Sequence, residues 1–205
     1  MHSTFSKRKC DAYASSLLKE LKIESLPIDP REIAQRIGLS IIEESADSFD
    51  GCFIREIKKI IINKNLDEVI KRFTIAHELG HARIPYHNDK EYKDARENIG
   101  FPFTKKQEED EANEFASELL MPTFLIGGIV RSEKMGLNTI KLISEKCQTS
   151  FTSSALAYVK ASPELCVMVV SDASKIKYSF ASDALSVRHQ PFLDTISFYN
   201  RRLLD

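Results

Sequence analysis

The sequence lacks several features that would assign it to a protein class at once. Its four cysteines are scattered, with no C-x-x-C pair, so neither a zinc ribbon nor a disulfide framework is indicated. It has no uninterrupted apolar run of about 18 residues and no charged-then-apolar leader, the patterns of membrane helices and secretory signals. Its 29 basic and 30 acidic residues give a net charge of -1, which favours no polyanionic partner. We expect a cytoplasmic protein with reduced thiols and no direct contact with membranes or nucleic acid.

The remaining composition is that of an ordinary soluble globular chain of 205 residues, with no internal repeat. The run K-I-I-I-N-K near residue 60 is β-branched and strongly apolar, which predicts a central strand. Hydrophobic periodicity and capping residues predict the other elements. The predicted helices span 8–22, 30–37, 67–84 (with Asn65 as the alternative start), 107–120, 123–131, 137–147 and 151–159. The predicted strands span 39–43, 51–55, 59–63, 165–171 and 175–180. The polar segment 87–106 is expected to be a loop beside the active site.

The stretch F-T-I-A-H-E-L-G-H-A at residues 73–82 is the most informative part of the chain. His77 and His81 are four residues apart, so on a helix both imidazoles project from one face and can reach one zinc ion at roughly 2.0–2.1 Å. Such an ion would acidify a water molecule and polarise a scissile carbonyl. Glu78, between the two histidines, could then take the proton from water and pass it to the leaving amine.

Histidine pairs with this spacing also occur as simple surface or core groups, and the helical wheel bears on that alternative. The pair shares one side of the predicted helix with three apolar residues: Leu66, Ile70 and Phe73. That side is expected to face inward, where two histidines without partners would be costly. A second apolar stripe, formed by Ile75 and Leu79, lies on the far side. The pattern favours a helix sandwiched inside a domain, with the histidines holding a metal ion.

A catalytic zinc ion normally takes a third protein ligand, and the predicted helix over 107–120 offers several carboxylates. Its apolar stripe comprises Ala112, Phe115, Ala116 and Leu119. On the wheel Glu108 lies close to the centre of this stripe and Glu111 lies on its edge, so geometry favours one of these two. The alternative for both is a carboxylate that merely interacts with the helix dipole, worth about 0.3–1 kcal/mol.

His87 is a competing candidate for the third ligand. It follows His81 by six residues, the spacing at which metzincin proteases place their third histidine. Those proteases need a glycine three residues after the second histidine to turn the chain, and this sequence has Ile84 there. His87 is therefore a better candidate for binding substrate or stabilising an oxyanion.

Two separated strings resemble the ImmA/IrrE family of bacterial and phage metallopeptidases. They are R-F-T-I-A-H-E-L-G-H at residues 72–81 and E-A-N-E-F-A-S-E-L-L-M-P at residues 111–122, and the resemblance covers roughly residues 26–160. It implies that Glu111, which opens the second string, is the third zinc ligand beside His77 and His81, with Glu78 as catalytic base. Manganese could replace zinc in vitro, because these ligands do not select one metal.

The expected fold is α+β and zincin-like, with a small twisted sheet packed on the helix of His77 and His81 and a helical C-terminal half. We expect a metallopeptidase domain over residues 1–160 that includes a helix-turn-helix-like part. Residues 161–205 are expected to form a β-hairpin extension packed on that domain, the alternative being an element that senses a signal or docks a partner.

Members of the resembled family are typically encoded beside helix-turn-helix repressors and cut them to release genes. The resemblance thus implies a zinc-dependent endopeptidase whose protein partner is a helix-turn-helix repressor. The alternative is a DNA-binding regulator with a structural or vestigial metal site, because the helices over 137–147 and 151–159 are spaced like a helix-turn-helix. The second of these begins F-T-S-S-A, which lacks the arginine, asparagine or glutamine that would read bases. The oligomeric state has no sequence signature.

Overall fold

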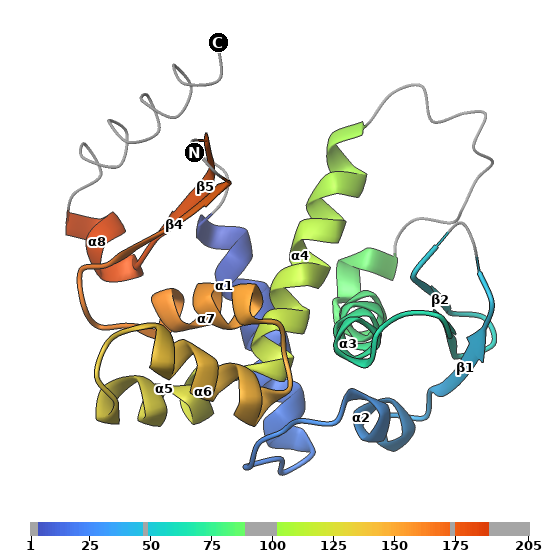
Figure 1. The fold of residues 1–205 in the computed structure, drawn as a ribbon. Helices are drawn as coiled ribbons and strands as arrows, with labels where there is room; N and C mark the ends of the chain where they lie inside the picture. Colours follow the sequence, from blue (N-terminus) through green and yellow to red (C-terminus); the bar gives the residue numbers. More distant parts are fainter. Residues whose placement is uncertain (1–3, 47–48, 89–101, 173–174, 189–205) are drawn as a thin grey trace. The chain divides into compact units, whose positions relative to one another are not determined.

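The computed structural model describes residues 4–46, 49–88, 102–172 and 175–188 (Figure 1). They form the α+β structure that the sequence predicts, with small sheets and a largely helical C-terminal half. The chain divides into two compact units: Met1–Pro122 with Cys147–Thr149, and Thr123–Lys146 with Ser150–Asp205. The division predicted from the sequence, a peptidase domain over residues 1–160 with an extension over 161–205, stays a prediction.

The first unit contains a three-stranded sheet and the helices that surround it. Its elements are α1 (Thr4–Glu20), α2 (Pro30–Arg36), β1 (Ser40–Glu44), β2 (Gly51–Ile54), β3 (Lys59–Asn63), α3 (Glu68–Arg83), the 3-10 turn η1 (Pro85–Asn88) and α4 (Pro102–Leu120). Strand β3 lies in the centre, parallel to β1 and antiparallel to β2. Ile60 and Ile62 of β3 are fully buried, which confirms the predicted central strand.

Helix α3, which carries the two histidines, lies between the sheet and α4 (Figure 1). It begins at Asp67, whose carboxylate accepts a hydrogen bond from the backbone N–H of Val69 at 2.9 Å, and it ends just before Pro85. Ile75 and Leu79 are fully buried, but Ile70 is 46% exposed. The prediction that the side bearing the histidines faces inward is therefore wrong at Ile70, whereas the predicted apolar stripe of Ile75 and Leu79 lies in the core.

Helices α3 and α4 approach each other closely at Gly80. A β-carbon at this position would lie 3.2 Å from the α-carbon of Ala112 and 3.3 Å from the β-carbon of Phe115. Gly80 thus lets the backbone of α4 come nearer to α3 than any larger residue would permit. One turn of α4 on either side of Ala112 is consequently held over the face of α3 that bears the histidines.

The second unit consists of helices and a hairpin. Its elements are α5 (Thr123–Ser132), α6 (Leu137–Cys147, whose last residue belongs to the first unit), α7 (Phe151–Ala161), β4 (Val167–Asp172), β5 (Lys175–Ala181) and α8 (Asp183–Arg188). Strands β4 and β5 pair antiparallel, as predicted, and both contact α7. The sequence did not predict α8.

The polar segment between α3 and α4 was predicted to be a loop. Most of the predicted loop over 87–106 lies outside the described residues, although α4 begins at Pro102, five residues before the predicted start.

Among the residues that the structure describes, no helix combines the length and apolarity that crossing a lipid bilayer requires.

Candidate metal centre

His77 and His81 lie on one face of α3, one helical turn apart, as their spacing predicts. Their Nε2 atoms are 3.0 Å from each other, and their side chains are 14% and 21% exposed. Both imidazoles therefore turn the same nitrogen toward one point that solvent can still reach.

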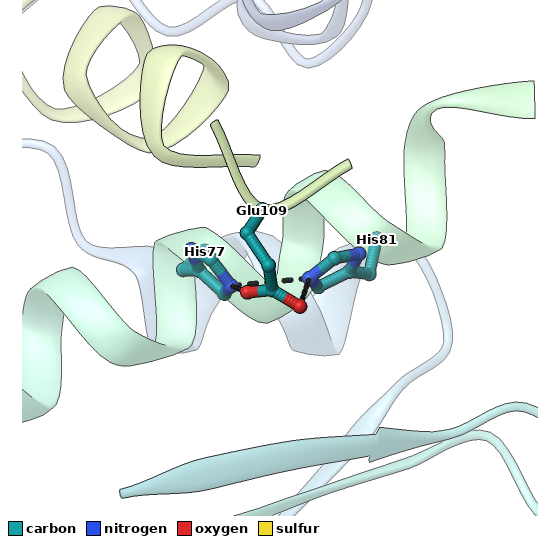
Figure 2. Close-up of side chains that lie close together, drawn as sticks. All are labelled: His77, His81 and Glu109. Carbon is teal, nitrogen blue, oxygen red and sulfur yellow. Dashed lines mark hydrogen bonds and ion pairs between the residues drawn. The ribbon is translucent and has the colours of Figure 1, made fainter. Parts of the chain in front are cut away.

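Glu109 of α4 completes this group. Its Oε2 lies 3.1 Å from Nε2 of His77, and its Oε1 lies 3.8 Å from Nε2 of His81 (Figure 2). Within the described part of the chain, this is the group of histidine, cysteine and acidic side chains whose ligand atoms all lie within 4.8 Å of one another. Two imidazoles and one carboxylate are a common ligand set of catalytic zinc sites.

The distances between the donor atoms suit a metal ion. Ligands at roughly 2.0–2.1 Å in a tetrahedral arrangement stand about 3.3 Å from one another, and the separations here are 3.0, 3.1 and 3.8 Å. Nδ1 of His77 lies 2.9 Å from Oδ1 of Asn113, and because an amide oxygen only accepts, the tautomer that fits this contact has its N–H on Nδ1 and its lone pair on Nε2. That lone pair faces the Glu109 carboxylate, an arrangement that a cation between them would stabilise.

The structure does not bring Glu111 to His77 and His81. Glu111 is 5% exposed, and its Oε2 lies 3.1 Å from Nε2 of His87 while its Oε1 accepts a hydrogen bond from Gln107 at 2.9 Å. His87 in turn contacts His81 through the two Nδ1 atoms, 3.1 Å apart. Neither Glu111 nor His87 belongs to the donor group, and nor does Glu108, the other carboxylate that the helical wheel favoured.

Glu109 was missed by the sequence analysis, although a signal for it exists. Glu109 and Asn113 are four residues apart, the same spacing as His77 and His81, so one face of α4 presents both of them to one face of α3. Such a pair suits two histidines on a facing helix. The acidic side chain can bind the same metal ion as the histidines, and the amide can accept a hydrogen bond that orients one of the rings.

Glu78, the predicted base, is 7% exposed. Its pKa is raised to about 7, chiefly by burial and also by the nearby Glu109 carboxylate, although a hydrogen bond from the backbone of Phe53 on β2 acts in the opposite direction. The pKa of His81 is lowered to about 4, chiefly by burial and also by the neighbouring His77. His81 is therefore neutral at neutral pH, as a metal ligand must be, and Glu78 can both accept and release a proton there.

The chain is similar to several known proteins. The family model of the IrrE N-terminal-like domain, peptidase M78, matches residues 34–133. An uncharacterized immunity region protein 2 of Bacillus phage phi105 is 29% identical over 125 residues, which are 60% of this chain and 74% of that protein. A solved structure of a Mycobacterium tuberculosis transcriptional regulator has a similar fold, with a TM-score of 0.59 at 15% identity. The match covers 85% of this chain but only 55% of the regulator.

Proposed function

We propose that the chain is a member of the ImmA/IrrE family and a zinc-dependent endopeptidase, because residues 34–133 match the M78 peptidase family model and a phage immunity region protein is 29% identical over 125 residues. The observation that carries the proposal is the convergence of the ligand atoms of His77, His81 and Glu109 within 4.8 Å, close enough to the buried carboxyl of Glu78 for the Glu109 carboxylate to raise its pKa. Metal-assisted hydrolysis of a peptide bond needs both a group that binds the metal ion and a base that takes a proton from water.

In this proposal the zinc ligands are His77, His81 and Glu109. Glu109 takes the place that the sequence assigned to Glu111, because its carboxylate is the one that faces both Nε2 atoms. Asn113 holds the ring of His77 in the orientation that presents Nε2. A bound zinc ion supplies Lewis acidity, which acidifies water and polarises the scissile carbonyl.

Glu78 is the proposed general base and then general acid. It takes a proton from the attacking water and delivers that proton to the amine that leaves when the peptide bond breaks. Its pKa of about 7 suits both steps, because a group that is half protonated at the working pH can accept and release a proton with little cost. Its burial also keeps bulk water from competing for that proton.

We further propose that the substrate is a helix-turn-helix repressor and that its cleavage in the cytoplasm releases the repressed genes. Support comes from the phage relative, whose name refers to an immunity region, and from the anti-repressor role that the family resemblance implies. A peptidase in the cytoplasm also needs a narrow substrate range, since general proteolysis there would damage the host.

The test is co-expression with each transcription factor encoded beside this gene. We expect the wild type to cut one of them, and Glu78→Gln to leave it intact while retaining metal, because the substitution removes the base but none of the ligands. Glu24→Gln, which changes an exposed carboxylate on the loop between α1 and α2, is the matched control and should cut normally. Undiminished cleavage by Glu78→Gln would refute the assigned mechanism.

A DNA-binding regulator is the second candidate. Helices α6 and α7 are joined by only three residues, a connection found in helix-turn-helix motifs. A mobility-shift assay with the DNA upstream of the gene separates the candidates. Tight, salt-sensitive and sequence-dependent binding by the Glu78→Gln protein would favour the regulator.

A further inference from the structure

A chain of polar contacts extends from His81 away from the proposed metal site. Nδ1 of His81 lies 3.1 Å from Nδ1 of His87, and Nε2 of His87 lies 3.1 Å from Oε2 of Glu111. Gln107 then contacts the other oxygen of Glu111 at 2.9 Å. The side chains of His87 and Glu111 are only 1% and 6% exposed, so water does not compete for these contacts.

The chemistry of Glu111 sets the direction in which these hydrogen bonds run. An ionised carboxylate only accepts, so the Gln107 amide and the Nε2–H of His87 both donate to it. A neutral imidazole has a single N–H, so Nδ1 of His87 carries a lone pair and accepts the Nδ1–H of His81. His81 is thereby left with its own lone pair on Nε2, the atom that faces His77 at 3.0 Å and Glu109 at 3.8 Å.

We propose that Glu111 and His87 are positioning residues that hold His81 in the tautomer able to bind the metal ion, an inference that rests on the proposed metal site. Histidine ligands commonly donate their second N–H to a carboxylate or carbonyl. Here the carboxylate acts through an intervening imidazole, while Asn113 performs the same task directly for His77. This role also accounts for the burial of an acidic residue that is not itself in the donor group.

Two other arrangements of the same residues make opposite predictions. If His87 carried both of its N–H groups, it would donate to His81, whose own proton would then sit on Nε2 and block metal binding. If Glu111 were instead a direct ligand, its replacement would change the set of donor atoms around the metal. In the proposed arrangement Nε2 of His81 is free to bind the metal ion, and replacing Glu111 changes the tautomer of His81 without changing the donor atoms.

Glu111→Gln is the decisive variant because it reverses the hydrogen bonds without changing the shape of the side chain. With the Gln107 amide donating as it does in the wild type, the new amide oxygen takes the place of Oε1, and the NH2 group faces His87 and donates to Nε2. His87 then carries its proton on Nδ1 and donates to His81. We expect His81 to move its proton to Nε2 in this variant.

The first measurement is the tautomer of each histidine in the metal-free protein, from ¹⁵N NMR of histidine-labelled samples. The wild type should show Nδ1–H for both His77 and His81, and Glu111→Gln should change His81 alone. The second measurement is titration with Co²⁺ alone, followed by its visible absorption. Co²⁺ binding should weaken about 10–100-fold, as is usual when a partner of a metal ligand is lost, with the absorption band at an unchanged position.

Variants of His87 supply an independent test should Glu111→Gln fold poorly. His87→Asn keeps an acceptor oxygen at the place of Nδ1 and should bind Co²⁺ more tightly than His87→Leu, which keeps none. Glu24→Gln, the exposed control, should match the wild type in both measurements.

The outcomes separate this inference from the proposed function. An unchanged His81 tautomer with unchanged Co²⁺ affinity in Glu111→Gln would overturn the positioning role, and a displaced absorption band would overturn it by making Glu111 a direct ligand. A wild-type protein that binds no Co²⁺ would refute the metal site itself. The NMR measurement would still decide whether Glu111 sets the tautomer of His81.

Discussion

Gly80→Ala probes the contact that holds α4 against α3. The added methyl group would lie 3.2 Å from the α-carbon of Ala112 and 3.3 Å from the β-carbon of Phe115. Carbon atoms in comfortable contact are about 3.5–4.0 Å apart. Since one obstacle is backbone and the other is the β-carbon of a fully buried side chain, neither can rotate away. Helix α4 must therefore move back by a few tenths of an ångström.

Two opposing effects determine the stability of this variant. Alanine in place of glycine inside a helix contributes about 1 kcal/mol, whereas overpacking a filled core costs about 1–3 kcal/mol. We expect a net loss of about 1 kcal/mol in the free energy of unfolding. Because Glu109 and Asn113 flank Ala112 on α4, part of the strain reaches the donor atoms. A strain of about 1 kcal/mol there would weaken metal binding about fivefold.

Chemical denaturation of the metal-free protein and a zinc titration measure the two effects separately. Gly128→Ala is the matched control, because Gly128 lies inside α5 and a β-carbon there would meet nothing within 4 Å. It should gain about 1 kcal/mol and bind zinc normally. If Gly80→Ala gained as much as the control and kept its zinc affinity, the close contact would not set the geometry of the site.

Other contacts lead to further predictions. Asp67→Ala removes the acceptor that caps α3 at the N–H of Val69 and should lower the free energy of unfolding by about 1 kcal/mol in urea titrations, while Asp67→Asn should lose little. A hydrogen bond from Lys71 lowers the pKa of Glu43 in the folded protein. The stability that this hydrogen bond contributes is therefore present above the ordinary pKa of a glutamate and is lost as the pH falls through the lowered pKa of Glu43. Lys71→Met should therefore reduce stability at neutral pH and hardly at all in strong acid; an equal loss at both would contradict this. Burial raises the pKa of Cys10 to about 11, so iodoacetamide at neutral pH should label Cys10 only after unfolding, as peptide mass spectrometry can show.

Local patterns were sufficient to predict most of the elements and two of the three donor residues. Helix geometry alone brings His77 and His81 together, and three consecutive isoleucines identify the central strand β3. Asp67 was one of two positions proposed for the start of α3, and its side chain caps the helix there. Each of these features depends on residues within a few positions of one another, which is the range over which sequence patterns act.

The third donor depends on how two helices pack, and sequence periodicity could not decide it. At about 100° per residue, Glu109 and Glu111 lie on opposite edges of the apolar stripe of α4, each about 80° from its centre. Helix α4 packs against both α1 and α3, so both edges are partly covered. The contact at Gly80 determines which edge meets the histidines, and the exposure of Ile70 is likewise decided by what packs on α3.

The donor group also ties together two helices that are separated in sequence by residues 84–101. A cation bound there would act as a cross-brace, and its binding energy would add to that of folding, by about 2.7 kcal/mol when free metal exceeds the dissociation constant a hundredfold. When the cation is scarce, the protein would lose activity and would also be less stable. The less stable chain would be degraded faster by the proteases of the cell.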